Sequence, residues 1–203
     1  MKTSQRKSLI ILFTAVLIIT GLVAVGRFCP ASGIAFSRKV REFNRLKNRT
    51  TPPQRADFDA LVTLSSMLEP GEDWSRHSPS QAARIEGYVV YVGKGGLELA
   101  NCYLPCGRDT HINVALRPDA SPREQVVLEI TPRMRDAARR RGLDWSEETL
   151  GRELPGHWCH FEGWLFFDWN HAGEAQNTAP QGLSNWRATA WELHPVTNLE
   201  VVR

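Results

Sequence analysis

The order of short β-type and helical segments after residue 84 restricts the fold more than any other feature of the sequence. Three segments with the apolar pattern of strands come first, a helical segment follows, and further strands end the chain. In order, they are strands at 85–92, 111–116 and 125–130, a helix at 133–141, and strands at 157–167, 186–193 and 196–202. Five main strands with a helix between the third and fourth is the order of an OB-fold, a partly open Greek-key barrel. The sequence therefore predicts a mainly β fold, an OB-fold-like five-stranded barrel with an inter-strand helix, at 81–203. Another small β-barrel or a split sheet is the alternative.

Four short motifs in the same region resemble those of one family. They are DTHI at 109–112, EITPR at 129–133, GWLFFD at 163–168 with His171 after it, and WELHPVT at 191–197. The last resembles the W-E-[IL]-H-P-V-T ending of a family of uncharacterised bacterial OB-fold-like domains. The resemblance covers the barrel region only. It implies a fold and no particular activity, because one fold hosts many functions.

The N-terminus holds a long uncharged run at 8–26, preceded by Lys2, Arg6 and Lys7. A helix of this length roughly matches a ~30 Å hydrocarbon core. We therefore predict a transmembrane anchor at 1–26, with a cleaved signal peptide as the alternative. The basic N-terminus favours a cytoplasmic start, whereas the six cations just beyond the run would, by count alone, favour the opposite topology. The expected location is the inner (plasma) membrane, as a single-pass protein with a periplasmic or extracytoplasmic body.

The net charge of +3 conceals an uneven distribution. Residues 1–55 hold 11 basic side chains and one acid, whereas residues 84–203 hold 13 basic and 16 acidic ones. The region 27–80 is expected to begin with a basic juxtamembrane helix at 36–49, whose apolar stripe is Val40, Phe43 and Leu46. A second amphipathic helix at 54–68 and a polar linker are expected to follow. An acidic body disfavours a nucleic-acid partner, since phosphate neutralisation dominates such binding.

Acid–histidine pairs recur near the ends of the predicted strands. The six candidate ligand or polar-network residues are Asp109 with His111, Asp168 with His171, and Glu192 with His194. Carboxylates and imidazoles bind divalent metals and serve as acid–base pairs. They equally form polar networks that hold strand ends together. The sequence leaves both interpretations open, and the network is the simpler.

The cysteines allow a disulfide, free thiols or, less readily, a metal site. The expected disulfide joins Cys102 to Cys106, or one of these to Cys159. A zinc site would use Cys102, Cys106, His157 and Cys159, although C-x3-C is not the common zinc spacing. Cys29 is expected to remain free or to pair between chains. No cofactor is predicted.

The tryptophans of the barrel region are expected to be mainly core residues, with an exposed pair able to line a glycan or peptide groove. No phosphate-binding loop, nucleophile elbow or dinucleotide fingerprint is present in the sequence. These features favour a membrane-anchored, non-catalytic OB-like binding or assembly module at the cell envelope, with the membrane and an unknown protein or glycan as partners. The alternatives are an envelope metal-dependent enzyme that uses the Asp/Glu–His pairs, and a single-strand nucleic-acid binder.

Overall fold

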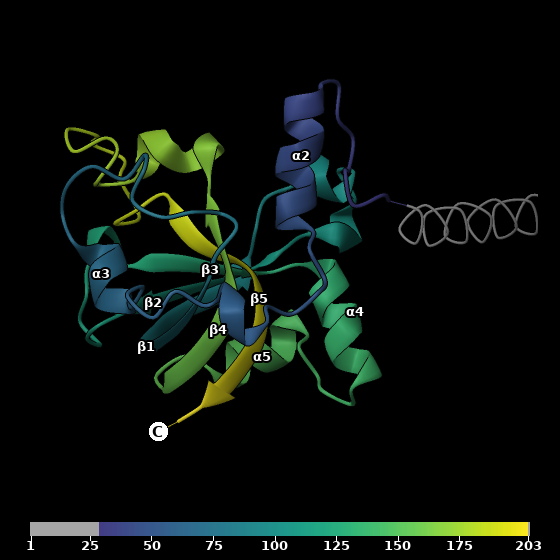
Figure 1. Ribbon diagram of the computed structural model, residues 1–203. Helices are drawn as coiled ribbons and strands as arrows, with labels where there is room; N and C mark the ends of the chain where they lie inside the picture. Colours follow the sequence, from purple (N-terminus) through teal and green to yellow (C-terminus); the bar gives the residue numbers. More distant parts are fainter. Residues whose placement is uncertain (1–28, 203) are drawn as a thin grey trace, which may run out of the picture.

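A five-stranded closed barrel forms the body of the protein. The computed structural model describes residues 29–202. The strands are β1 (Ala82–Lys94), β2 (Thr110–Ala115), β3 (Val126–Ile130), β4 (Trp158–Phe167) and β5 (Trp191–Val201). Their order around the barrel is β1-β2-β3-β5-β4, and only the β3–β5 pair is parallel (Figure 1). The mainly β prediction is confirmed, and the closed barrel is consistent with an OB-like fold.

Two helices lie between the third and fourth strands. Helix α4 (Pro132–Arg140) begins at Thr131, whose hydroxyl accepts a hydrogen bond from the Met134 amide, and α5 (Glu147–Glu153) begins at Ser146 in the same way. Both are N-cap residues of the preferred type. The predicted inter-strand helix is therefore present and is followed by a second short helix.

The barrel interior is filled by alternate residues of the strands. Ile112, Leu128, Phe161 and Leu193 have no exposed surface. Because side chains alternate across a strand, the residues next to them in sequence point to the outside of the barrel wall. Of the tryptophans expected in the core, two are buried, Trp145 and Trp191. The rest are half-buried, apart from the exposed Trp169.

Gly163 lies at an irregularity in the β4–β5 pairing. A Cβ atom at this position would lie 2.8 Å from the Pro195 carbonyl oxygen and 3.1 Å from Leu193 Cβ. The two backbones approach this closely only because residue 163 has no side chain.

The last strand differs from the prediction. Residues 186–190 are not part of it, and β5 runs without a break from Trp191 through the cis His194–Pro195 bond to Val201, so the two predicted strands are one. The segment before it is held by Asp73, whose carboxylate accepts hydrogen bonds from Thr189 Oγ1 at 2.6 Å and from the Ala190 amide at 3.1 Å. The Ala188 amide also donates to the Gln125 carbonyl, so the segment is held by contacts with distant residues rather than by a strand ladder.

Helix α2 (Arg38–Lys47) confirms the predicted basic helix and covers the outside of the barrel (Figure 1). Its fully buried residues are Asn44 and Lys47, whereas the predicted apolar stripe is only half-buried. Phe43 of that stripe packs on Phe166 of β4, with ring centroids 4.8 Å apart. The side of the helix that faces the barrel therefore carries the charged Lys47 side chain as well as the Phe43 contact.

The predicted second helix at 54–68 is wrong over most of its length. Only a 3-10 turn at Arg55–Asp57 and the short helix α3 (Leu64–Leu68) form. The Asp57 carboxylate binds the Gln54 amide, and the Thr63 and Ser66 side chains cap a separate helix start. Local capping bonds of this kind compete with a continuous helix.

The predicted transmembrane helix at 8–26 lies outside the described residues. Within residues 29–202, none of the helices has the length and apolar character needed to cross a bilayer.

Candidate functional site: a buried acid–histidine centre

The three predicted acid–histidine pairs come together on the outer face of the barrel wall. β2 begins and β3 ends at the same end of the barrel, since His111 pairs with Glu129. β4 ends where β5 begins, since Phe166 pairs with Glu192, and the parallel β3–β5 pair sets Leu128 beside Leu193, which brings Glu129 next to His194. Within each of the pairs at 109/111 and 192/194, the two residues are two positions apart and so share a face. We call this group the acid–histidine centre; its members are Asp109, His111, Glu129, Asp168, His171, Glu192 and His194.

His194 occupies the middle of the centre. Its Nδ1 atom lies 3.1 Å from Glu192 Oε2, with which it shares a hydrogen bond, and 3.3 Å from Glu129 Oε2. Its Nε2 atom lies 3.8 Å from Asp109 Oδ2. The remaining contacts are made by the two more peripheral histidines: His111 Nε2 is 3.0 Å from Glu129 Oε1, and His171 Nδ1 is 2.8 Å from Asp168 Oδ2. Carboxylate oxygens of Asp168, Glu129 and Glu192 lie within 4.8 Å of one another, so all six residues predicted from the sequence belong to one cluster.

Two cations from elsewhere in the chain accompany the carboxylates. Lys47 reaches in from α2, where its Nζ atom lies 2.6 Å from Glu98 Oε2. Arg187 donates from Nη2 to Glu192 Oε1 at 2.6 Å, and both side chains are fully buried. The sequence interpretation did not identify Lys47, Glu98, Glu129 or Arg187. Glu129 offered a signal, as the one charged residue of the apolar strand at 125–130.

Burial shifts the protonation equilibria of the centre. It raises the pKa of Asp109, of Glu129 and of Glu192, and the neighbouring carboxylates add to the effect on the first two. Burial lowers the pKa of His194 and of His111. Each of these shifts disfavours the charged form of a desolvated group.

The Asp168–His171 pair behaves in the opposite way. Although burial alone would raise the pKa of Asp168, the hydrogen bond with His171 and the charge of Lys47 hold it below its usual value. The hydrogen bond with Asp168 raises the pKa of His171. This pair is therefore stabilised as carboxylate and imidazolium.

Several atoms of the centre form no hydrogen bond with any residue in 29–202. They are Asp109 Oδ2, His111 Nε2, both carboxylate oxygens of Glu129, His194 Nε2, and Nε and Nη1 of Arg187. The close contacts of Glu129 with the histidines are ion-pair distances without hydrogen-bond geometry. Buried polar atoms are almost always hydrogen-bonded, and leaving one unpaired costs about 1–3 kcal/mol. The described residues thus leave several polar atoms of the centre without a hydrogen-bond partner, and the network interpretation stays a prediction.

A surface cavity of about 370 Å³ opens beside the centre. Lys47, Glu98, His111 and His171 line its inner side. The deeper residues Glu129, Glu192 and His194 do not line it and have no exposed surface. The centre consequently has a polar rim facing solvent and a sealed interior.

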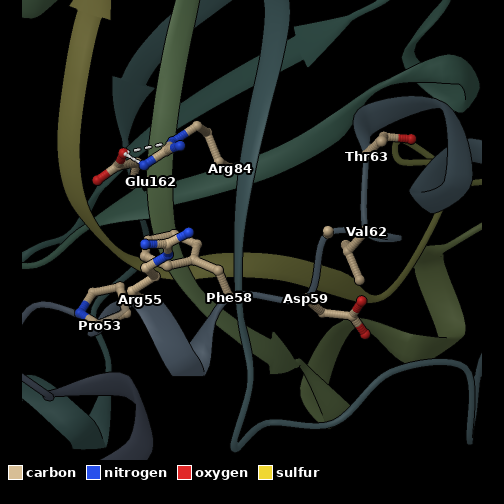
Figure 2. A pocket seen from close by; sticks show the side chains of 9 residues that line it. Pro53, Arg55, Phe58, Asp59, Val62, Thr63, Arg84 and Glu162 are labelled. Carbon is tan, nitrogen blue, oxygen red and sulfur yellow. Dashed lines mark hydrogen bonds and ion pairs between the residues drawn. The ribbon is translucent and has the colours of Figure 1, made fainter.

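Another pocket, of about 600 Å³, lies away from the centre and is lined by residues around the 3-10 turn and the segment before α3 (Figure 2). Arg84 Nη2 and Glu162 Oε1 are paired in its lining at 2.6 Å, and the Arg84 guanidinium lies over the Phe58 ring. Asp59, also in the lining, accepts hydrogen bonds from the Leu61 amide and from Gln81 Nε2. These three titratable groups are therefore already engaged.

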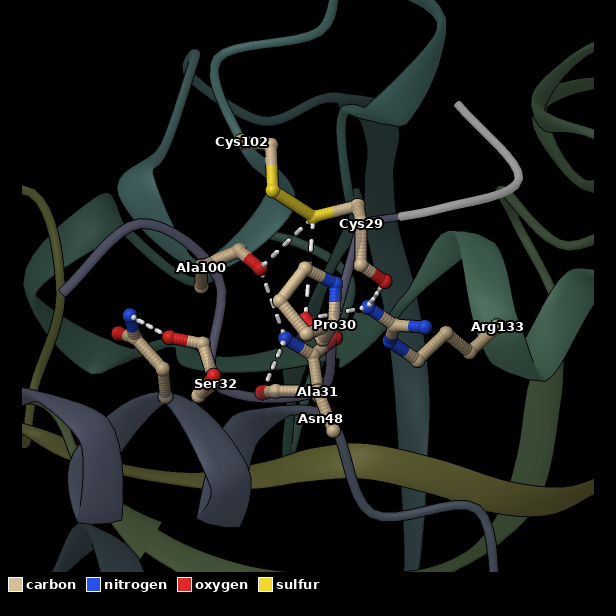
Figure 3. The surroundings of a disulfide bond; sticks show 9 residues. Cys29, Pro30, Ala31, Ser32, Asn48, Ala100, Cys102 and Arg133 are labelled. Carbon is tan, nitrogen blue, oxygen red and sulfur yellow. Dashed lines mark hydrogen bonds between the residues drawn. A yellow bond between two sulfur atoms is a disulfide. The ribbon is translucent and has the colours of Figure 1, made fainter. Parts of the chain in front are cut away.

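The disulfide differs from both expected pairings. Cys29 is bonded to Cys102, as shown in Figure 3, while Cys106 is a free, exposed thiol and Cys159 a free, buried one. The partner is distant in sequence because residues 29–34 run along the 3-10 turn at Leu99–Asn101, where the Ile34 amide donates to the Leu99 carbonyl at 2.9 Å. Cys102 is therefore unable to supply a thiolate to the zinc set considered above. Burial raises the pKa of Cys159 to about 11.

Exposed aromatic and basic side chains lie on and just before α2, in the loop after β4 and in the loop before β1. Phe36 is 90% exposed, Trp169 54% and Trp74 48%. The two tryptophan rings are 5.0 Å apart, and Lys39 Nζ lies 5.4 Å from the Trp169 ring centroid. The exposed cations of this surface are Arg38, Lys39, Arg41 and Arg45. We refer to these seven residues as the aromatic–basic face.

Comparison with known proteins adds no family to this description: no protein-family model matches the chain, and the search of curated proteins finds no match.

Proposed function

We propose that this chain is a membrane-anchored, non-catalytic OB-like binding module, and that it works at the surface of the cell envelope. The observation that carries the proposal is the aromatic–basic face. Tryptophans favour the interface between headgroups and hydrocarbon, and arginine and lysine side chains bind anionic headgroups. The apolar run predicted to be the anchor ends at residue 26, shortly before α2 begins at Arg38.

Two further observations support this arrangement. Four cations of α2, Arg38, Lys39, Arg41 and Arg45, are exposed, and Arg38 is paired with the exposed Glu42 of its own helix. A cavity of about 340 Å³ lies between α2 and Trp169, lined by Phe43 and Leu46 among others, and gives the face a hollow with apolar walls. A lipid headgroup layer fits such a surface, since it offers negative charge outside and apolar chains within.

The non-catalytic part of the proposal is supported by the sealed interior of the acid–histidine centre. A catalytic site keeps its reacting groups within reach of substrate, in a cleft that can hold a molecule. Glu129, Glu192 and His194 have no exposed surface, and only the rim residues reach the cavity. This distribution favours a binding or structural role over the metal-dependent enzyme considered from the sequence.

The test uses the full chain in nanodiscs that contain lipids with brominated acyl chains, which quench nearby tryptophans. One set of discs is phosphatidylcholine alone and the other also contains phosphatidylglycerol. We expect strong quenching that increases with the anionic lipid. Trp169→Phe should remove much of the quenched signal, whereas the buried Trp145→Phe should remove only unquenched signal. Equal quenched fractions in Trp169→Phe and the original chain would refute contact of this face with lipid.

The side of the membrane is tested separately. Fusions of alkaline phosphatase and of a fluorescent protein to the C-terminus report an extracytoplasmic or a cytoplasmic body, respectively. Active phosphatase is expected. A fluorescent fusion with inactive phosphatase would overturn the envelope assignment.

A further inference from the structure

We propose that the acid–histidine centre is a binding site for one divalent transition-metal ion, held by Asp109, Glu129 and His194. This inference does not depend on the proposed membrane function. One ligand atom from each of these three residues lies within 4.8 Å of the other two. Asp109 is 2% exposed, and Glu129 and His194 have no exposed surface.

The unpaired atoms of the centre are the atoms that would bind the ion. Asp109 Oδ2, both Glu129 oxygens and His194 Nε2 form no hydrogen bond with any described residue, and all are buried. His194 Nε2 and Asp109 Oδ2 are 3.8 Å apart, close to the spacing of neighbouring ligands around an ion with bonds of about 2.1 Å. A cation between them would satisfy several unpaired acceptors at once, which no side chain in residues 29–202 does.

The other side of each ligand is already fixed. With its proton on Nδ1, His194 donates to Glu192 Oε2 at 3.1 Å, which leaves the Nε2 lone pair for the metal. Asp109 Oδ1 accepts from Asn101 Nδ2 at 3.0 Å, which leaves Oδ2 facing inward. Metal-binding histidines commonly donate their second N–H to a carboxylate in this manner, and the partner fixes both tautomer and ring orientation.

The hydrogen bonds also distinguish this set from a second one. Glu129, Asp168 and Glu192 are equally close together. Asp168, however, uses one oxygen for the Asn170 amide and the other for His171. Glu192 uses its oxygens for Arg187 and His194. These two carboxylates therefore act as supports around the ion rather than as its ligands.

The charges of the centre are consistent with a dication. Five carboxylates, Glu98 included, face Lys47 and Arg187, and the charges of Arg133 and Arg135 also act on Asp109. The close approach of several buried carboxylates is costly unless a cation or protons lie between them. One imidazole with two carboxylates suits zinc, manganese or iron(II) better than magnesium or calcium, which prefer oxygen ligands alone. The competing occupant is protons shared among the carboxyl groups.

The experiment measures metal directly on the full chain in mild detergent, purified without chelator. Elemental analysis should give about one zinc, manganese or iron per chain, lost on dialysis against a chelator. Cobalt(II) added to the stripped protein should produce the visible absorption bands of a bound ion. The melting temperature should fall on stripping and recover with zinc or manganese, and not with magnesium.

Two variants and a control test whether a metal ion, rather than shared protons, occupies the centre. Asp109→Asn and His194→Gln should weaken metal binding by more than about 10-fold, the loss seen even for supporting residues of metal sites. The control is His160→Gln, which alters an exposed acid–histidine pair of similar spacing, with His160 Nε2 3.0 Å from Glu86 Oε2, and should leave binding unchanged. If a variant fails to fold, the cobalt spectrum of the unaltered chain still decides. A metal-free chain that shows no cobalt bands and no thermal response to zinc, manganese or iron overturns the proposal and leaves the centre held by protons.

Discussion

Replacing Lys47 with methionine gives the sharpest test of how the acid–histidine centre contributes to stability. The side chain is 2% exposed, and its ammonium group lies among four carboxylates, of which Glu98 is in direct contact at 2.6 Å. Although burial alone would favour a neutral amine, the charges of Glu129, Glu98, Asp168 and Asp109 raise the pKa of Lys47. Methionine keeps much of the apolar stem and removes only the charge.

Removing one partner of a buried ion pair leaves its counter-charge uncompensated and costs about 3–5 kcal/mol. With a urea dependence of about 2 kcal/mol per molar, the unfolding midpoint should fall by about 2 M. The assay is urea unfolding of the full chain in mild detergent, followed by tryptophan fluorescence. Arg38→Met is the matched control on the same helix, because Arg38 has an ion pair of similar length to Glu42 but is 87% exposed, and its midpoint should not move measurably.

Two results would refute this reasoning. A Lys47→Met midpoint equal to that of Arg38→Met would show that the lysine charge is not needed by the carboxylates. Glu98→Gln should relieve part of the cost in the double variant, because the two groups are in contact. Strictly additive losses would show that the pair is not coupled.

Three further predictions concern other parts of the molecule. Cys29→Ser removes a crosslink between residues 73 apart in sequence and should lower the free energy of unfolding by about 2–4 kcal/mol, measured without reductant. His171→Gln should abolish a pH dependence of stability, because the hydrogen bond with Asp168 raises the pKa of His171 in the folded state. The stabilisation from His171 is full below its unfolded-state pKa of about 6.5 and is lost as the pH rises through its folded-state pKa. Gly163→Ala should lower thermal stability by about 1–3 kcal/mol, since the new methyl group would meet the Pro195 carbonyl oxygen.

Each of these has its own control. Cys106→Ser alters a free, exposed thiol and should change nothing. The charged groups that affect His171 besides Asp168 are Arg187 and Glu192, so an unchanged pH profile in His171→Gln would assign the dependence to them. Gly151→Ala in α5 adds a methyl group with no atom within 4 Å and should stabilise the chain slightly. Equal effects of the two glycine variants would contradict the close approach at Gly163.

The strands could be predicted where burial follows the local pattern of the sequence. The alternation at 85–92 and the apolar runs before and after the helical insert gave β1 to β4 within a few residues. The segment 186–190 misled the prediction because it is held by bonds to Asp73 and Gln125, which are distant in sequence, and not by a neighbouring strand. The short helix at Leu64–Leu68 was overextended because an apolar stripe does not reveal where side-chain caps interrupt the backbone.

The acid–histidine pairs could be identified from the sequence because each lies at a strand end. Their convergence could not, since it depends on the parallel pairing of β3 with β5, which places Glu129 beside the residues of β5. Lys47 gave no signal, because nothing in a basic helix marks the one lysine that points inward. The sequence did not reveal the disulfide, because its two cysteines come together only when the segment that begins at Cys29 packs on the barrel.

The Cys29–Cys102 bond also limits how far the barrel can stand from its anchor. Fully extended, the chain from Cys29 to the start of β1 at Ala82 would reach about 180 Å. In the folded protein, α2 packs on the barrel, and the crosslink fixes the start of the segment there, with the Cα atoms of Cys29 and Cys102 6.0 Å apart. In the anchored protein proposed above, only Arg27 and Phe28 separate the apolar run from this crosslink, a length of roughly 10 Å. The barrel would then lie directly against the lipid headgroups, and its partners would have to bind it at the membrane surface.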